Sequence, residues 1–238
     1  MLSTASMADP TKPKSGGGCF STLITLVFLV AAIGLGAAVF FIAQPQDLSD
    51  LGGYGPAAKV APVKDVKAVL KNSLDRGFPV TLTEADINIW LDRTLVRKQG
   101  GSLGSQASLE RVWVRLEDGF AEVIMERKIL NQPFTVSMFV KVEKMEGPRG
   151  LVTEVKLDGG PYHPDVTKPP RGGRFGKLVV PQGFLILIMP AYEKLAASFK
   201  EERSLGIEEM SRIKMEKGRI ILNPRAPADS DSLLPKTF

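Results

Sequence analysis

Few side chains in this sequence could carry out acid–base, nucleophilic or metal chemistry. The chain contains one histidine, His163, and one cysteine, Cys19. Structural zinc sites need several thiolate or imidazole ligands, and a nucleophilic serine or cysteine needs a nearby base. We find no serine in a nucleophile elbow, the sharp strand-to-helix turn that exposes a catalytic serine. We therefore expect a protein that is not an enzyme, with no catalytic residue, no metal site and no cofactor.

Two local patterns resemble functional motifs but are given ordinary structural interpretations. His163-Pro164-Asp165 matches the tripeptide signature of J-domain cochaperones. That signature lies in a loop between two helices, whereas here a predicted strand precedes the tripeptide, so we interpret His163 as a loop residue. The neighbouring carboxylates Glu84 and Asp86 are predicted to lie on a solvated helix face, because spacing alone does not make an acid–base pair.

A basic segment rich in Gly and Pro could contact an anionic group. It contains Lys168, Arg171, Arg174 and Lys177. It is not a nucleotide P-loop, because Arg171 and Leu178 occupy the positions that require Gly and Ser or Thr. We predict that these four basic residues are candidate contacts to an anionic head group, with a solvated basic loop as the alternative.

An unbroken apolar run occupies residues 184–189. We predict that Phe184, Ile186, Leu187 and Met189 form either a surface for an apolar ligand or part of a core helix that is buried on all sides. A second membrane span is not expected, because the uncharged stretch around this run is short and is interrupted by proline.

A longer apolar run, over residues 19–43, predicts one transmembrane helix. No charged residue occurs between Ser15 and Gln46. A helix over this run would be about 37 Å long, against about 30 Å for the hydrocarbon core of a bilayer. A cleavable signal peptide is the alternative, but it ends in small residues, whereas Phe41 and Ile42 are bulky. We therefore predict an uncleaved signal anchor with a single pass.

Charges on either side of the run predict its orientation. Lys12 and Lys14 precede it, whereas Asp47 and Asp50 follow it. Positively charged flanks remain in the cytoplasm. We expect residues 1–18 to form a cytoplasmic tail and the C-terminal part to lie outside the inner (plasma) membrane, in the cell envelope.

The composition of the external part predicts three segments. Residues 44–62 are rich in Pro and Gly and are predicted to be a tether. Residues 63–223 are predicted to form an extracytoplasmic domain. Residues 224–238 are polar and are predicted to be a flexible tail.

The expected partners are a membrane and a ligand or protein of the envelope. The formal net charge of +5 and the pI of about 9.3 are too modest to indicate nucleic-acid binding. Within the apolar run, the pairs Ala32 with Gly36 and Gly34 with Ala38 have small-xxx-small spacing. Such spacing could seat a second copy of the helix, so a homodimer through the span is one expectation.

Helical periodicity predicts three helices after the apolar run, over about 63–76, 84–97 and 182–203. Thr83 and Asp86 form a variant of the capping box at the start of the second helix. In each segment the apolar residues recur on one side of the helix, so one buried apolar stripe is predicted for each helix.

Strand periodicity predicts an antiparallel sheet. Between residues 112 and 157, apolar and polar residues alternate in four segments joined by short turns. Residues 158–176 contain so many Gly and Pro that we expect no regular element there, but either an ordered flap or a disordered excursion. A closing hairpin is predicted from residue 207 to 222, around Lys217-Gly218. The predicted class is α+β, with a curved antiparallel sheet packed against helices.

Several of these features together resemble the YpmS-like single-span membrane proteins of bacteria. The segment Leu82–Leu91 (LTEADINIWL) is similar to their Leu-Thr-x-x-x-Leu/Ile-Asn helix start, and Gly176–Pro181 is similar to their Gly-x-Leu-x-x-Pro element. The resemblance covers roughly residues 78–222. It implies one N-terminal span and an external domain, and it implies no particular activity.

The function expected from the sequence is that of a membrane-anchored, non-enzymatic binding or scaffold domain in the cell envelope. A lipid or other apolar ligand would lie between the sheet and the late helix. The alternative is an accessory subunit that docks on an envelope enzyme or complex and has no ligand of its own.

Overall fold

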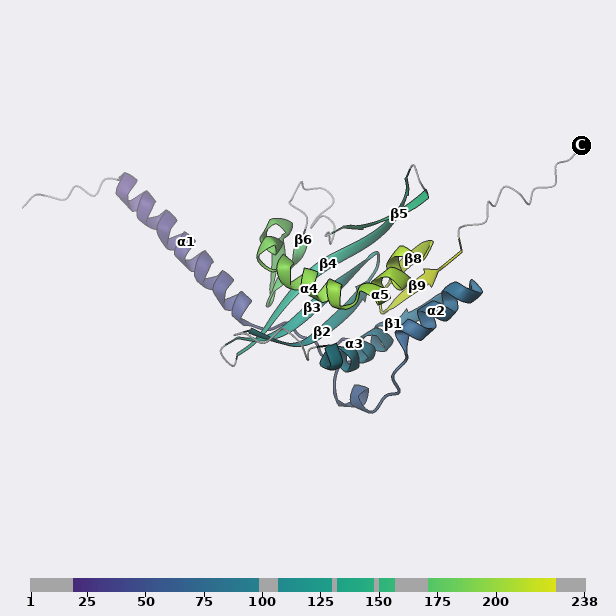
Figure 1. Cartoon of the computed structure of the whole chain (residues 1–238). Helices are drawn as coiled ribbons and strands as arrows, with labels where there is room; N and C mark the ends of the chain where they lie inside the picture. The colour runs from purple at the N-terminus through teal and green to yellow at the C-terminus, as the bar shows by residue number, and fades with distance from the viewer. Residues whose placement is uncertain (1–18, 99–106, 130–131, 148–149, 157–170, 226–238) are drawn as a thin grey trace, which may run out of the picture. The chain divides into compact units, whose positions relative to one another are not determined.

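The computed structural model describes residues 19–98, 107–129, 132–147, 150–156 and 171–225 (Figure 1). The chain divides into two compact units, residues 1–40 and residues 41–238. Several predictions fall outside the described residues: the cytoplasmic tail 1–18, the His163-Pro164-Asp165 tripeptide, the basic residue Lys168 and residues 226–238 of the flexible tail.

The apolar helix α1 spans Cys19–Ala43, the bounds predicted for the membrane span. Its side chains are mostly exposed, and Phe28 is a typical case at 71%. Among the described residues it is the one helix that is long and apolar enough to cross a membrane, although a signal sequence near an N-terminus has the same properties. Phe41 and the residues that follow it belong to the second unit.

A six-stranded sheet lies at the centre of the second unit (Figure 1). Its strands are β2 (Ala107–Glu117), β3 (Phe120–Ile129), β4 (Gln132–Gly147), β5 (Gly150–Lys156), β6 (Arg171–Phe175) and β7 (Leu178–Pro181). The order is β2-β3-β4-β6-β7, and β5 pairs with the C-terminal half of β4. Every pair is antiparallel. The structure thus confirms the mixed helix-and-sheet class and the antiparallel sheet.

The strand β6 corrects the expectation that residues 158–176 hold no regular element. Glycine is unfavourable in most strands, but here it permits a close approach between β6 and β4. A Cβ on Gly173 would overlap the carbonyl oxygen of Ser137, and a Cβ on Gly172 would meet the backbone of Gln182. The glycines that suggested a loop are the residues that let this strand join the sheet.

A three-stranded sheet of order β1-β9-β8 flanks the larger one. It consists of β1 (Val80–Thr83), β8 (Arg212–Glu216) and β9 (Arg219–Asn223). The predicted turn at Lys217-Gly218 is confirmed, with Gly218 at φ +74°. The start of the hairpin differs from the prediction, because Ser204–Glu208 forms a short π-helical segment, η3, and residue 207 is not in a strand.

Two hairpin tips connect the two sheets. The N–H of Gly218 donates to the carbonyl of Leu116 at 3.0 Å, and the N–H of Gly119 donates to the carbonyl of Met215 at 3.1 Å. Gly119 has φ +84°, which the tight turn between β2 and β3 requires. These bonds fix the small sheet beside the end of β2.

The first two predicted helices form where expected. Helix α2 spans Val66–Arg76, with Asp65 as its N-cap, and α3 spans Glu84–Lys98. At the start of α3, the Thr83 hydroxyl accepts from the N–H of Asp86 and the Asp86 carboxylate accepts from the N–H of Thr83, each at 3.1 Å. This reciprocal pair is the predicted capping box. A short 3-10 turn, η1 (Pro56–Lys59), lies before α2.

The predicted helix over 182–203 is divided into shorter elements. A 3-10 turn, η2 (Gln182–Leu187), is followed by α4 (Met189–Ser198) and α5 (Lys200–Arg203). The apolar run at 184–189 is therefore not a core helix. Leu185 is buried at 1% exposure, whereas its neighbours in η2 point outward, because a 3-10 turn presents successive side chains to different sides.

Part of the predicted tether is packed against the six-stranded sheet. Leu48 and Leu51 are buried in a cluster with Trp113 and Ile124. The N–H of Gln46 also donates to the hydroxyl of Thr135 at 2.9 Å. The expectation that all of residues 44–62 is a linker is therefore wrong. Leu48 and Leu51, three residues apart among the Pro and Gly residues, attach this part of the segment to the apolar side chains of the sheet.

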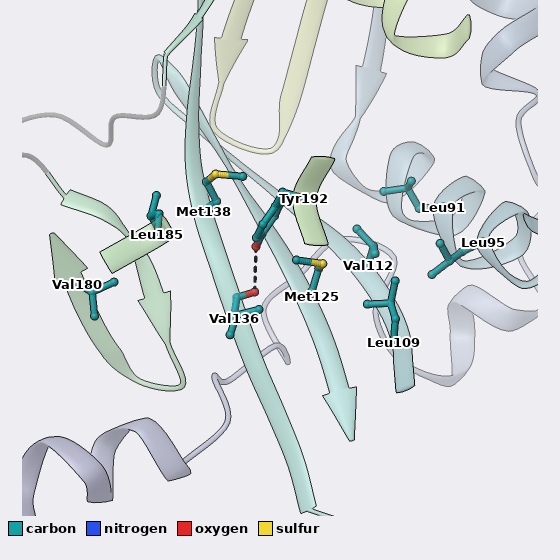
Figure 2. Packing of buried hydrophobic residues seen from close by; sticks show 10 residues of the cluster. All are labelled: Leu91, Leu95, Leu109, Val112, Met125, Val136, Met138, Val180, Leu185 and Tyr192. Atoms are coloured by element: carbon teal, nitrogen blue, oxygen red, sulfur yellow. Dashed lines mark hydrogen bonds between the residues drawn. The ribbon is translucent and has the colours of Figure 1, made fainter. Parts of the chain in front are cut away.

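The largest apolar core lies between the six-stranded sheet and helices α3 and α4 (Figure 2). In this view Leu91 and Leu95 of α3 are directed towards Val112 of β2, and Tyr192 of α4 is directed at the sheet. The buried members are Leu91, Leu95, Leu109, Val112, Met125, Val136, Met138, Val180, Leu185 and Tyr192.

Candidate functional site: an apolar cavity between the sheet and helices α3 and α4

A cavity of about 480 Å³ opens within this layer. Ligand pockets in proteins commonly have volumes of about 300–1,000 Å³. We call it the apolar cavity, and it is lined by Ile87, Trp90, Leu91, Val112, Val114, Val123, Met138, Val140, Thr153, Val155, Tyr192, Leu195, Ala196, Phe199, Glu202, Arg203, Ile207 and Glu208. Its walls therefore come from β2–β5, from α3 and from the segment α4–α5–η3.

The sheet wall follows from strand alternation. Val112 and Val114 of β2, Val123 of β3, and Met138 and Val140 of β4 all lie on one face of the sheet. Successive side chains of a strand point to opposite faces, so every second residue of these strands reaches the cavity. The alternation that predicted one apolar face of the sheet therefore accounts for the sheet wall of the cavity.

Helix α3 supplies one side wall through Ile87, Trp90 and Leu91, which have i, i+3, i+4 spacing. The first turn of the same helix carries a buried carboxylate. Glu84, only 7% exposed, accepts the backbone N–H of Gly52 and of Leu116, each at 2.7 Å. The expectation that Glu84 lies on a solvated face is wrong, because one carboxylate oxygen accepts from the loop at Gly52 and the other from Leu116 of β2.

Asn88, one turn after Glu84, completes this attachment. It is fully buried, and its Nδ2 donates to the carbonyls of Gly52 at 2.8 Å and Val114 at 2.9 Å. Its Oδ1 accepts from the N–H of Val114 at 2.7 Å. Strand β2 is at the edge of the six-stranded sheet, so the two side chains satisfy backbone groups that no further strand could pair.

The segment α4–α5 supplies the other side wall. Leu195, Ala196 and Phe199 line the cavity from it, and the Phe199 and Trp90 rings meet with centroids 5.5 Å apart. Tyr192 fixes α4 to the sheet, because its hydroxyl donates to the carbonyls of Val123 at 2.8 Å and Val136 at 3.2 Å.

Tyr192 does not act as an acid or base at neutral pH. Burial, and secondarily the charge of Glu122, hold the pKa of its phenol well above the ordinary value. The phenol therefore stays protonated and remains a hydrogen-bond donor to the two carbonyls. Its contribution to the site is to position α4.

The polar residues of the lining come from neighbouring elements β5, α5 and η3. We call Thr153, Glu202, Arg203 and Glu208 the polar rim. Arg203 and Glu208 form an ion pair at 3.2 Å. Lys144 joins the rim, because its ammonium group donates to the Thr153 hydroxyl and to the Glu208 carbonyl. Partial burial lowers the pKa of Lys144, and the charge of Glu208 opposes that effect.

The apolar residues predicted as a ligand surface lie elsewhere. Phe184, Ile186 and Leu187 are exposed at 55%, 75% and 73% and do not line the cavity. Met189 is partly buried and packs against the core, also outside the cavity lining. The ligand surface was predicted at the longest apolar run after α1, whereas the cavity is lined by the following helix, where apolar residues recur with helical spacing.

Of the four predicted basic residues, the structure describes the side chains of Arg174 and Lys177 and the backbone of Arg171. The backbone of Arg171 lies in β6, and Lys177 is exposed in the turn between β6 and β7. Arg174 lies on the face of the sheet away from the cavity, 3.4 Å from the Glu122 carboxylate and with its guanidinium over the Phe139 ring. None of these three lines the apolar cavity.

That second face of the sheet holds a buried carboxylate cluster, defined as Glu122, Ser137, Arg115 and Arg174. Glu122 is 1% exposed and accepts from the Ser137 hydroxyl at 2.6 Å. Its carboxylate lies 3.2 Å from Arg115, which also pairs with Asp50 at 2.8 Å. Strand alternation predicted a wet face here, so the burial of these charges was missed. The leucines Leu48 and Leu51 could have indicated this burial, because they predict that the segment after α1 packs against this face of the sheet.

No group of three or more His, Cys, Asp or Glu side chains within the described part of the chain is placed to hold a metal ion. The apolar cavity offers a hydrophobic lining, one positioned phenol and a charged rim. A scan against protein-family models and a search of curated proteins found no match to this chain.

Proposed function

We propose that this protein is a membrane-anchored domain outside the cytoplasm that binds the apolar part of a lipid, or of a similar ligand, in the apolar cavity. The observation that carries the proposal is a cavity of about 480 Å³ whose interior is lined by aliphatic and aromatic side chains. Such a space is favourable for a hydrocarbon chain, because transfer of apolar surface out of water provides the free energy of binding.

The polar rim supports an amphipathic ligand rather than a pure hydrocarbon. Arg203 and Lys144 carry positive charge at the rim, and Glu202 and Glu208 carry negative charge. A polar head group could exchange hydrogen bonds with these side chains while the acyl chain lies among Leu195, Phe199 and the strands. This division into an apolar lining and a few polar groups is typical of small-molecule sites in proteins.

Membrane anchoring through α1 places the domain beside a source of such ligands. The proposed orientation keeps Lys12 and Lys14 in the cytoplasm and the domain outside it. The resemblance to YpmS-like proteins remains a prediction that agrees with this arrangement. In its support, Leu82–Leu91 forms the end of β1 and the start of α3, and Gly176–Pro181 forms the turn before β7 together with that strand.

The proposal is tested by photo-crosslinking the full chain in vesicles that contain a phospholipid with a diazirine-bearing acyl chain. Labelled peptides are then mapped by mass spectrometry. We expect label in peptides from α4 and from β2–β4 as well as in α1. Because α1 contacts bilayer lipid in any case, its labelling is an internal control for reconstitution.

Two adjacent alanines offer matched variants. Ala196 lines the cavity, whereas Ala197 is exposed. We expect Ala196→Phe to remove label from α4 and the strands while α1 stays labelled, and Ala197→Phe to change neither. Label confined to α1 in the unmodified chain would refute the ligand proposal and leave the docking subunit as the function to pursue.

A further inference from the structure

We propose that the ligand of the apolar cavity carries an anionic head group, and that Lys144 of the polar rim selects this ligand by binding that group. The inference rests on the proposed function and deepens it, because it names the class of amphiphile that enters the cavity. The volume of about 480 Å³ lies in the lower half of the range for small-molecule sites, which favours one acyl chain over two.

Lys144 lies at the end of the apolar row that β4 contributes to the cavity. Met138 and Val140 line the cavity, and Lys144, four residues after Val140 in the same strand, points to the same face. Lys144 is also in register with Thr153 of β5, which lines the cavity as well. An acyl chain that lies along this row therefore brings its end to the ammonium group of Lys144.

Two hydrogen bonds hold this ammonium group in place and leave one of its donors unused. It donates to the Thr153 hydroxyl and to the backbone carbonyl of Glu208, the latter at 3.0 Å. A lysine ammonium has three donors, and the described part of the chain supplies no third acceptor. Both acceptors are neutral, so no carboxylate of the described residues is bonded to the ammonium group. An acceptor on a ligand would complete its hydrogen bonds.

The carboxylate of Glu208 is held by other groups. It forms the ion pair with Arg203 at 3.2 Å, and it accepts from the Ser204 hydroxyl at 3.1 Å. The charges of Arg203 and Glu208 therefore offset each other. Lys144 is left as the rim cation that an anionic ligand can neutralise.

The remaining rim carboxylate, Glu202, acts on a different lysine. A hydrogen bond to Glu201, and to a smaller extent the charge of Glu202, raises the pKa of Lys67 in α2. The charge of Glu202 is thus partly offset by a cation outside the cavity lining.

Burial adds to the need of Lys144 for a counter-ion. Partial burial lowers its pKa, and the charge of Glu208 opposes that effect. A charge that has lost part of its hydration is stabilised when an opposite charge comes within hydrogen-bond distance. Carboxylates and phosphates are the oxygen anions that form strong charge-assisted hydrogen bonds with an ammonium group. We therefore expect one of these two as the head group.

The test uses the full chain in phosphatidylcholine vesicles, whose head groups carry no net charge. Three photoprobes share one diazirine-bearing alkyl chain and end in a carboxylate, a phosphate or a hydroxyl group. Labelled peptides are mapped by mass spectrometry. Label in α4 and β2–β4 is divided by label in α1, which reports the amount of probe in the bilayer.

Three variants accompany the unmodified chain. Lys144→Met removes the charge and keeps an apolar side chain of similar length, whereas Lys144→Arg keeps the charge. Lys141→Met is the matched control, because Lys141 lies on the same strand, points to the other face and pairs with Glu143 at 2.7 Å.

We expect one or both anionic probes to label α4 and β2–β4 about tenfold more than the hydroxyl probe, because a charge-assisted hydrogen bond replaces a neutral one. The anion that labels more identifies the source, a free fatty acid or a lipid with a phosphate head group. Lys144→Met should reduce the preference to less than about twofold, while Lys144→Arg and Lys141→Met retain it.

Equal labelling of α4 and β2–β4 by all three probes in the unmodified chain would overturn the inference and leave the proposed function intact. An undiminished preference in Lys144→Met would also overturn it. Label that stays in α1 with every probe would overturn both the inference and the proposed function.

Discussion

The two faces of the six-stranded sheet are built in opposite ways. The face towards α3 and α4 is apolar and encloses the apolar cavity. The other face is covered by the segment that contains Leu48 and Leu51, and it buries the carboxylate of Glu122 among Arg115 and Arg174. The apolar face leaves unfilled space beside side chains that need no hydrogen-bond or ion-pair partner. The other face brings together charged groups, each of which needs a partner of opposite charge.

This difference indicates which face can accommodate a ligand. A buried carboxylate with two guanidinium partners is stabilised only in one geometry, so an inserted molecule would separate charges that are costly to separate. An apolar wall loses little when a hydrocarbon replaces empty space or water. The charged face therefore attaches the segment after α1 to the sheet, and the apolar face keeps its unfilled space.

The largest effect is expected from the charged face. Glu122→Ala should lower the free energy of unfolding by about 3 kcal/mol, because Arg115 and Arg174 lose a buried counter-ion. Urea denaturation of the full chain in detergent, followed by tryptophan fluorescence, measures it. The control Glu193→Ala removes an exposed carboxylate of α4 and should change stability by less than about 0.5 kcal/mol. Equal effects of the two would remove the distinction between the faces.

The next effect concerns the wall of the cavity. Asn88→Ala should cost about 2 kcal/mol, because backbone groups of Val114 and Gly52 lose their partners while they stay buried. The same denaturation measures it, and acyl-chain labelling of α4 should fall as α3 loosens. Asp92→Ala, one turn further along α3, serves as the control, since its ion pair with Arg111 at 3.7 Å is partly exposed. A loss as large for Asp92→Ala would contradict the assignment.

Overpacking distinguishes a filled face from a hollow one. Ser137→Phe, at a position with 0% exposure beside Glu122, should destabilise by about 1–3 kcal/mol. Ala196→Phe, which projects into the apolar cavity, should change the unfolding free energy by less than about 1 kcal/mol. Thermal unfolding of the two variants side by side makes the comparison. A cost for Ala196→Phe as high as that of Ser137→Phe would mean that the cavity is not available space.

A smaller effect is expected from the phenol that positions α4. Tyr192→Phe removes a hydroxyl that donates to two carbonyls and should cost about 1 kcal/mol. The raised pKa of Tyr192 means that its contribution is complete below the unfolded pKa of about 10 and is lost as the pH rises above it. Unfolding measured from pH 8 to 11 should fall less steeply in the variant. Identical slopes would show that the phenol ionises as freely in the folded chain as in the unfolded one.

The smallest expected effect is a change in tryptophan fluorescence when a ligand binds, which is measured on the folded protein. The chain has 2 tryptophans, and they lie on opposite faces: Trp90 lines the cavity and Trp113 packs with Leu48. A nitroxide-labelled fatty acid should quench the emission of the Trp113→Phe variant, which retains Trp90. It should leave the Trp90→Phe variant, which retains Trp113, nearly unchanged. The reverse pattern would place the ligand on the charged face.

Local patterns in the sequence predicted those elements whose stability depends on near neighbours. The apolar helix α1, the capping box of Thr83 with Asp86, and the turn at Lys217-Gly218 formed as expected. Each depends on residues within a few positions of one another, so composition and spacing are sufficient. The same holds for the alternation that predicted the antiparallel strands.

The cavity and the charged face required contacts between distant parts of the chain. Glu84 is buried because the loop at Gly52 and strand β2 both reach it, and neither is close in sequence. Ile186 in η2 shows the same dependence in reverse, since it is apolar yet lies outside the core. The sequence by itself determined the apolar helix, the helix caps and the strand periodicity, because these are local. Only the tertiary structure decided which face is hollow, because that depends on how α4 and residues 44–54 pack on opposite sides of the same strands.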